Sequence, residues 1–126
     1  MRSLGSMVVL TLVASSAAAQ TVTVTSSSPV EAKLAAIDAR SKVVQQSVIR
    51  QYARLLDSVD RKCKENRTQL GDITAKGVEL LAEKKVKMTH LKFLQSMNDS
   101  MPEGAETLNL SCVEIGALLA TMIERP

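Results

Sequence analysis

Few residues in this chain could do chemistry, and each type is scarce. The sequence contains two cysteines, Cys63 and Cys112, and a single histidine, His90. It contains no G-x-S-x-G or H-E-x-x-H motif, no phosphate-binding glycine loop and no C-x-x-C. No acidic residue stands out as half of a catalytic pair, and no nucleophile has an evident base beside it. We therefore expect no enzymatic activity and no cofactor.

One spacing could nevertheless indicate a metal site. His90, Met97 and Met101 occur at i, i+7 and i+11, which places them on one face of a helix. Histidine and methionine are ligands that suit Cu(I), so copper binding is one interpretation. In the other, Met97 fills the core, His90 is exposed in a first helical turn, and Met101 lies beyond the helix end because Pro102 follows it. We favour the second interpretation and predict no metal site.

Residues 1–19 have the pattern of a secretory signal peptide. Arg2 supplies the positive start, residues 7–14 form a short apolar run, and residues 17–19 are the small Ala-Ala-Ala before the expected cleavage at Gln20. The run is far shorter than the roughly 18 residues of a membrane span, so we expect no stable membrane insertion. The sequence thus predicts an exported protein, periplasmic or extracellular.

The predicted compartment determines how the two cysteines are interpreted, because disulfides form in exported proteins. In a small exported domain an even pair of cysteines favours one disulfide, here Cys63–Cys112. The alternative is two separate buried thiols. Closing a loop of about 50 residues would stabilise the fold by roughly 4 kcal/mol in the chain-entropy model.

Hydrophobic periodicity predicts an all-α domain of four helices over residues 29–126. Residues 20–28 alternate Val and Thr, but we expect a disordered spacer because we find no second strand to pair with them. A long first helix should begin with Ser28 and Glu31 as a capping box around Pro29. With no further Gly or Pro before Gly71, it should run for about 35 residues and end near Cys63.

Three shorter helices should follow, each with its own start signal. Asn66 with Gln69 starts the second, Thr89 the third, and Ser111 with Glu114 the last, which runs from Cys112 to about Glu124. Gly77 lies within the apolar stripe of the second helix, where a glycine costs about 1 kcal/mol relative to alanine. We expect a close approach by a neighbouring helix at that point.

The first half of the long helix is the predicted partner surface. Its apolar stripe of Val30, Leu34 and Ile37 is narrow and resembles an interhelical seam more than a core face. We expect a partner protein or a second copy of the chain to cover it. The alternative is a helix that bends near residues 45–47 and packs back on its own domain.

Charge is distributed unevenly along the chain. Residues 61–92 hold nine Lys or Arg and four acids, whereas residues 93–124 hold five acids and no base. We expect these two segments to neutralise each other within the fold, and a dipolar surface that orients a protein partner is the alternative. Only one tyrosine and one phenylalanine are available for stacking on bases, which disfavours nucleic acid as a partner.

All three asparagines, Asn66, Asn98 and Asn109, begin an N-x-S/T sequon. Two of them lie at predicted helix starts, where capping explains them, and we favour a bacterial exported protein over a glycosylated one. The function we expect is that of a small helical binding protein, such as an inhibitor or immunity protein acting on an envelope-targeting protein. The alternatives are a structural or chaperone-like protein that self-associates through its first helix, and a secreted glycoprotein effector.

Overall fold

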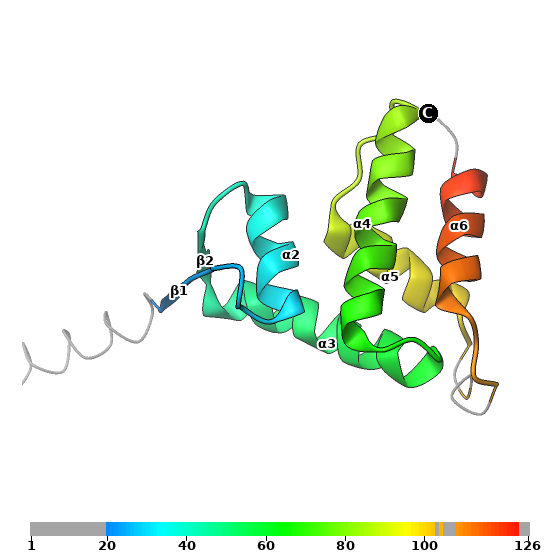
Figure 1. The fold of residues 1–126 in the computed structure, drawn as a ribbon, viewed down its shortest axis with the longest axis horizontal. Helices are drawn as coiled ribbons and strands as arrows, with labels where there is room; N and C mark the ends of the chain where they lie inside the picture. Colours follow the sequence, from blue (N-terminus) through cyan, green and yellow to red (C-terminus); the bar gives the residue numbers. More distant parts are fainter. Residues whose placement is uncertain (1–19, 103, 105–107, 124–126) are drawn as a thin grey trace, which may run out of the picture.

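The computed structural model describes residues 20–102, 104 and 108–123. Its elements in chain order are β1 (Thr21–Thr23), α2 (Val30–Ala39), β2 (Val43–Gln45), α3 (Gln46–Lys62), α4 (Arg67–Glu83), α5 (His90–Ser100) and α6 (Cys112–Met122). The structure is mostly helical and contains one disulfide, as predicted. The two strands and α2 lie at one end of α3, and α4, α5 and α6 lie toward its other end (Figure 1). The predicted signal peptide lies outside the described residues.

The predicted long first helix is wrong, because α2 and α3 are separate and the described residues form five helices instead of four. The break begins at Arg40, whose backbone adopts the left-handed conformation (φ 53°). The N–H groups of Arg40 and Ser41 donate back to the carbonyls of Ile37 and Ala36, which ends the helix in a Schellman motif. Glycine usually occupies the left-handed position that ends a helix, so the arginine at position 40 did not indicate a helix end in the sequence.

The expected disorder of residues 20–28 is also corrected. Strand β1 pairs with β2 in antiparallel register, with Val22 opposite Val44. The partner strand lies inside the segment that the sequence predicted as helix, so β1 had no evident partner in the sequence. Its β-branched residues Val43 and Val44 favour an extended backbone, and Val44 is buried.

The predicted capping residues of α4 and α5 form their capping hydrogen bonds, whereas the predicted capping box of α2 does not form. The box of Asn66 and Gln69 forms at the start of α4, each side chain accepting the other residue's backbone N–H at 2.9 Å. Thr89 caps α5 by accepting the N–H of Lys92 at 3.1 Å. At α2, however, the Ser28 box does not form: Pro29 is the N-cap, and Ser28 accepts from the backbone of Thr25 instead.

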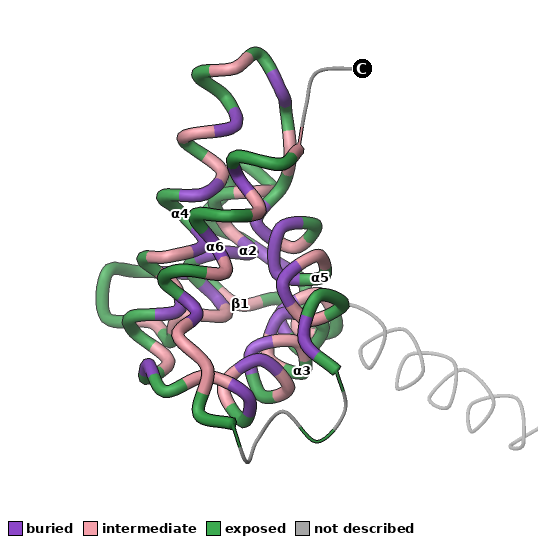
Figure 2. Tube along the Cα trace, turned by 90° about the vertical axis from the view of Figure 1, so that its right-hand side faces the viewer, coloured by how far each residue is buried: buried purple, intermediate pink, exposed green. Residues whose placement is uncertain are grey.

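The core lies where α3, α4, α5 and α6 meet, and buried residues recur along the inner sides of these helices (Figure 2). Its largest fully buried side chains include Phe93, Leu56, Leu70, Leu81, Leu94 and Met97. A Cβ on Gly77 would lie only 2.2 Å from Cζ of Phe93, so the absent side chain makes room for that ring. The predicted close approach at Gly77 is therefore confirmed, with a ring of α5 as the neighbour. Among the described helices, none combines the length and apolar character needed to cross a bilayer.

Candidate functional site

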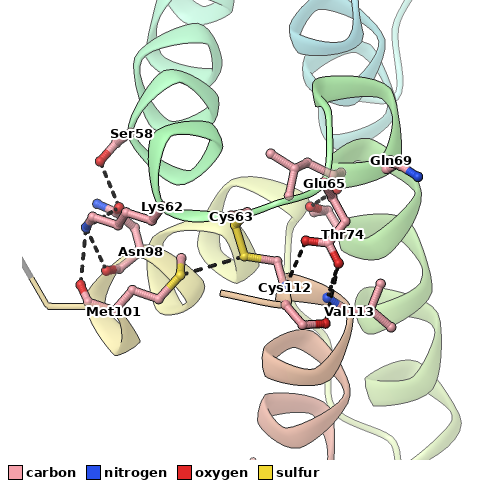
Figure 3. Close-up of a disulfide and its surroundings, with 12 residues drawn as sticks. Ser58, Lys62, Cys63, Glu65, Gln69, Thr74, Asn98, Met101, Cys112 and Val113 are labelled. Carbon is pink, nitrogen blue, oxygen red and sulfur yellow. Dashed lines mark hydrogen bonds between the residues drawn. A yellow bond between two sulfur atoms is a disulfide. The ribbon is translucent and has the colours of Figure 1, made fainter. Parts of the chain in front are cut away.

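The predicted disulfide joins the end of α3 to the start of α6. Cys112 Sγ lies 3.7 Å from Met101 Sδ, just after α5 (Figure 3). Beside it, the buried Lys62 ammonium donates to Asn98 Oδ1 at 3.0 Å and to the Met101 carbonyl at 3.2 Å. The end of α3 is therefore fastened to both α5 and α6, and this junction is structural.

The same junction holds one group of three potential metal ligands within the described part of the chain. The ligand atoms of Cys63, Glu65 and Cys112 lie within 4.8 Å of one another. The two sulfurs are bonded to each other, however, and the carboxylate of Glu65 accepts the backbone N–H groups of Cys112 and Val113 at 2.9 and 3.2 Å. With the disulfide intact, the donors of this group are committed to the fold.

The three residues considered as copper ligands, His90, Met97 and Met101, do not converge on one point. His90 begins α5 and Met101 follows its end, so the two are separated by about 16 Å along the helix axis. Met97 is fully buried in the core, as in the favoured interpretation. The expected exposure of His90 is wrong, because its ring is buried against Asp38.

Glu65 replaces the predicted cap of the last helix. Ser111 is the N-cap residue of α6, but its side chain forms no capping bond, and the expected box with Glu114 is absent. Burial by itself would raise the pKa of Glu65, but the N–H groups of Cys112 and Val113 stabilise the carboxylate, and the net pKa is lowered. A charge from before α4 thus stabilises the positive end of the α6 dipole.

Lys84 performs the opposite task at the other end of α6. Its ammonium donates to the carbonyls of Ala120 and Thr121 at 2.6 and 3.2 Å. Because Glu65 precedes α4 and Lys84 follows it, α4 and α6 must run parallel, side by side (Figure 1). Among the described residues, no ion pair joins a base of residues 61–92 to an acid of residues 93–124, so the predicted neutralisation is not what holds them together.

The outer side of α6 is unusually apolar. Val113, Leu118 and Met122 are 54%, 59% and 65% exposed, whereas the fully buried positions of this helix carry only Cys112, Gly116 and Ala120. A groove of about 250 Å³ lies between α4 and α6, next to Val113 and Ala117. Ile73, Leu80, Val113 and Ala117 line this groove, and we call these four residues the α4–α6 face. Leu118 and Met122 lie about 140° and 180° around α6 from Val113, and they belong to a separate part of the exposed surface.

The predicted partner stripe on α2 is largely used by the chain itself. Leu34 is buried, and Val30 packs on α4 with its Cγ1 2.8 Å from where a Cβ on Gly71 would lie. Ile37 alone of the three is exposed. This corrects the expectation that the first half of the long helix is a separate arm. The alternative of packing back on the domain describes the fold, with the break at Arg40 and β2.

A second cluster surrounds Asp38, near the end of α2. Its carboxylate accepts the Tyr52 hydroxyl at 2.6 Å, His90 Nδ1 at 2.7 Å, and the backbone N–H groups of His90 and Leu91 at 2.9 and 3.1 Å. Burial would raise the pKa of Asp38, but these hydrogen bonds outweigh it and lower the pKa. Burial and the neighbouring Asp38 carboxylate both raise the pKa of Tyr52. Asp38 therefore caps α5 as an anion and orients the imidazole.

Comparison with protein-family models, with curated proteins and with solved structures gives no match for this chain. Its function is therefore argued from the α4–α6 face and the Asp38 cluster. The disulfide and the described helices are compatible with an exported protein.

Proposed function

We propose that the chain is an exported helical binding protein that acts through contacts and not through catalysis, with the α4–α6 face as its binding surface. One observation carries this proposal: the most buried positions of α6 hold small side chains, whereas Val113 is exposed beside a groove that is open to a second helix. The larger Ile115 and Leu119 are only partly buried against the core. Val113 and Ala117 continue across the groove into Ile73 and Leu80, and exposed apolar surface of this kind is typical of a site of association.

The occupant that fits this face is the same face of a second copy, packed antiparallel. Asp72 lies in the second turn of α4 and Glu114 in the first turn of α6, and Lys84 and Lys85 follow the C-terminal end of α4, with Glu83 beside them. Lys76 also lines the groove. A two-fold axis would set Asp72 and Glu114 of each copy toward Lys84 and Lys85 of the other. It would also oppose the helix dipoles, which add within one copy because α4 and α6 are parallel.

The dimensions also suit a helix pair. From Ile73 to Leu80 the apolar positions of α4 on this face span about 10 Å, or two helical turns. Gly116 and Ala117 line the groove and allow a close approach of a second helix. In a two-fold contact each of these interactions is formed twice.

The test is the oligomeric state of the disulfide-bonded chain from Gln20 onward, measured by sedimentation from low to high micromolar concentration. The wild type should dimerise, and Ala117→Glu, at an exposed position that lines the groove, should raise the dissociation constant about 100-fold or more, because two buried carboxylates enter one interface. Ile37→Glu is the matched control, since Ile37 (56% exposed) is also an exposed helical residue. It lies on the stripe first predicted from the sequence.

Circular dichroism should show the same helical content in all three proteins. A wild type that stays monomeric throughout would contradict pairing through this face. Dissociation caused by Ile37→Glu instead of Ala117→Glu would place the interface on α2.

A further inference from the structure

A cavity of about 410 Å³ lies between the end of α2, the second half of α4 and the start of α5, away from the groove beside α6. Its walls are apolar at Val78, Val86 and Met88. Two cationic residues, Arg40 and Lys87, stand at its edge, and His90 completes the lining. This volume is within the range of about 300 to 1,000 Å³ typical of small-molecule sites.

The imidazole of His90 presents a free polar atom there. The side chain is largely buried, at 7% exposed for the whole residue, and its Nδ1 is taken by Asp38. Its Nε2 forms no hydrogen bond within the described residues, yet no fully buried side-chain nitrogen or oxygen there lacks a partner. Nε2 therefore keeps some exposure, and His90 is one of the residues that line this cavity.

Asp38 also lines the cavity, but its negative charge is already compensated. Both of its oxygens accept hydrogen bonds, Oδ1 from His90 and Oδ2 from Tyr52 and Leu91. Because the lowered pKa keeps Asp38 ionised, it holds the proton of the imidazole on Nδ1. Nε2 is thereby directed to a ligand: it accepts when the ring is neutral and donates when the ring is protonated.

We propose that this cavity binds a small anionic amphiphile, a carboxylate or phosphate monoester that carries a short apolar chain. Arg40 and Lys87 would hold the headgroup through charge-assisted hydrogen bonds, and His90 would add one from Nε2 when its ring is protonated. Val78, Val86 and Met88 would cover the chain. The inference goes beyond the proposed pairing, because the α4–α6 face contributes no residue to this cavity.

The experiment uses the fact that His90 is the only histidine. In a ¹H–¹³C spectrum of the folded, disulfide-bonded chain, the imidazole signals are therefore assigned without further work. Octanoate and octyl phosphate, added to millimolar concentration, should each shift these signals in a saturable way. Octanol tests for the apolar chain alone, and inorganic phosphate tests for the headgroup alone. Both should bind at least about tenfold more weakly than the matching amphiphile.

Two double variants separate a specific site from general charge. Arg40→Gln/Lys87→Gln should weaken octanoate binding by about tenfold or more. Lys33→Gln/Arg54→Gln removes the same charge from exposed residues that do not line the cavity, and it should bind like the wild type. Ala117→Glu should also bind like the wild type, so that failure of pairing and failure of the cavity are distinguishable.

Three outcomes would overturn the proposal. The first is that neither amphiphile moves the His90 signals. The second is that octanol moves them as strongly as octanoate, which would indicate an apolar hollow without anion recognition. The third is equal weakening by both double variants, which would indicate diffuse electrostatic attraction.

Discussion

At the residue scale, two carboxylates cap helices from far away in the sequence. Asp38 caps α5 from 52 positions before His90, and Glu65 caps α6 from 47 positions before Cys112. A sequence pattern reveals a cap only where the acceptor lies within the same turn, as Asn66 and Thr89 do. The same limit explains His90: its position in a first turn was predictable, but its burial against Asp38 depends on a contact with another helix.

Two variants compare the nearby candidate cap of α6, Ser111, with the distant one, Glu65. Glu65→Gln should lower the free energy of unfolding by about 2 kcal/mol, because the hydrogen bonds to Cys112 and Val113 lose their charged acceptor. Ser111→Ala should change it by only about 0.5 kcal/mol, because the Ser111 side chain forms no capping bond and donates only a long hydrogen bond, at 3.5 Å, to Glu65 Oε2. Urea denaturation at neutral pH measures both.

Acid provides the check on this assignment. Because the pKa of Glu65 is lowered in the folded state, its contribution is present above the ordinary value of 4.5 and is lost as pH falls through the folded value. The stability difference between wild type and Glu65→Gln should therefore shrink below about pH 4.5. A larger loss of stability in Ser111→Ala than in Glu65→Gln would indicate that Ser111 caps α6. So would a difference between wild type and Glu65→Gln that stays constant as the pH falls.

At the element scale, the amphipathic pattern located helical segments well and the break between α2 and α3 poorly. Val44, Val48 and Tyr52 fit helical spacing, although Val44 belongs to a strand paired with β1. Both assignments bury the same valine, so periodicity alone could not choose between them. The strand prevails because Arg40 ends α2 in a left-handed conformation that costs about 1 to 2 kcal/mol in a non-glycine residue. Tertiary packing offsets that cost, and it is not visible in the local sequence.

The packing of α4 on α5 depends on the missing side chain at Gly77. Gly77→Ala should destabilise the protein by about 1 to 3 kcal/mol, because the new Cβ would overlap the ring of Phe93. The helix propensity of alanine alone would give a gain of about 1 kcal/mol, so the sign of the change tests the contact. Thermal and urea unfolding should agree on it.

Gly71→Ala is the matched control in the same helix. There the new Cβ would meet only Cγ1 of Val30, the end of a side chain that is partly buried. Its cost should be smaller than that at Gly77. A double variant Gly77→Ala/Phe93→Leu should recover part of the loss relative to Phe93→Leu alone. A stabilising Gly77→Ala would contradict the placement of the ring.

At the scale of the whole molecule, α6 packs along α4 and is fastened at both of its ends. The disulfide and Glu65 hold its N-terminal end, and Lys84 holds its C-terminal end. The disulfide itself followed from the sequence, because two cysteines in an exported chain have one pairing. The α4–α6 face did not follow, because its position depends on which side of α6 meets α4. The sequence did offer one indication: α6 carries several large apolar residues besides the small ones that it buries.

The last prediction follows from this attachment. Cys63→Ala/Cys112→Ala should lower the free energy of unfolding by roughly 4 kcal/mol, because the disulfide closes a loop with a sequence separation of 49. The loss should not be uniform. Amide exchange should quicken most in α6, whose backbone opens without unfolding α3 and α5, since these share the buried contacts of Leu56, Phe93 and Leu94.

Pairing of two copies should weaken in the same variant, because the α4–α6 face exists only while α6 lies beside α4. The His90 signals and their response to octanoate should stay close to those of the wild type, since α6 does not line that cavity. Equal acceleration of exchange in all helices would mean that the disulfide stabilises one cooperative unit. Unchanged pairing after α6 has lost its protection would exclude the α4–α6 face as the interface, because Val113 and Ala117 would no longer lie beside Ile73 and Leu80.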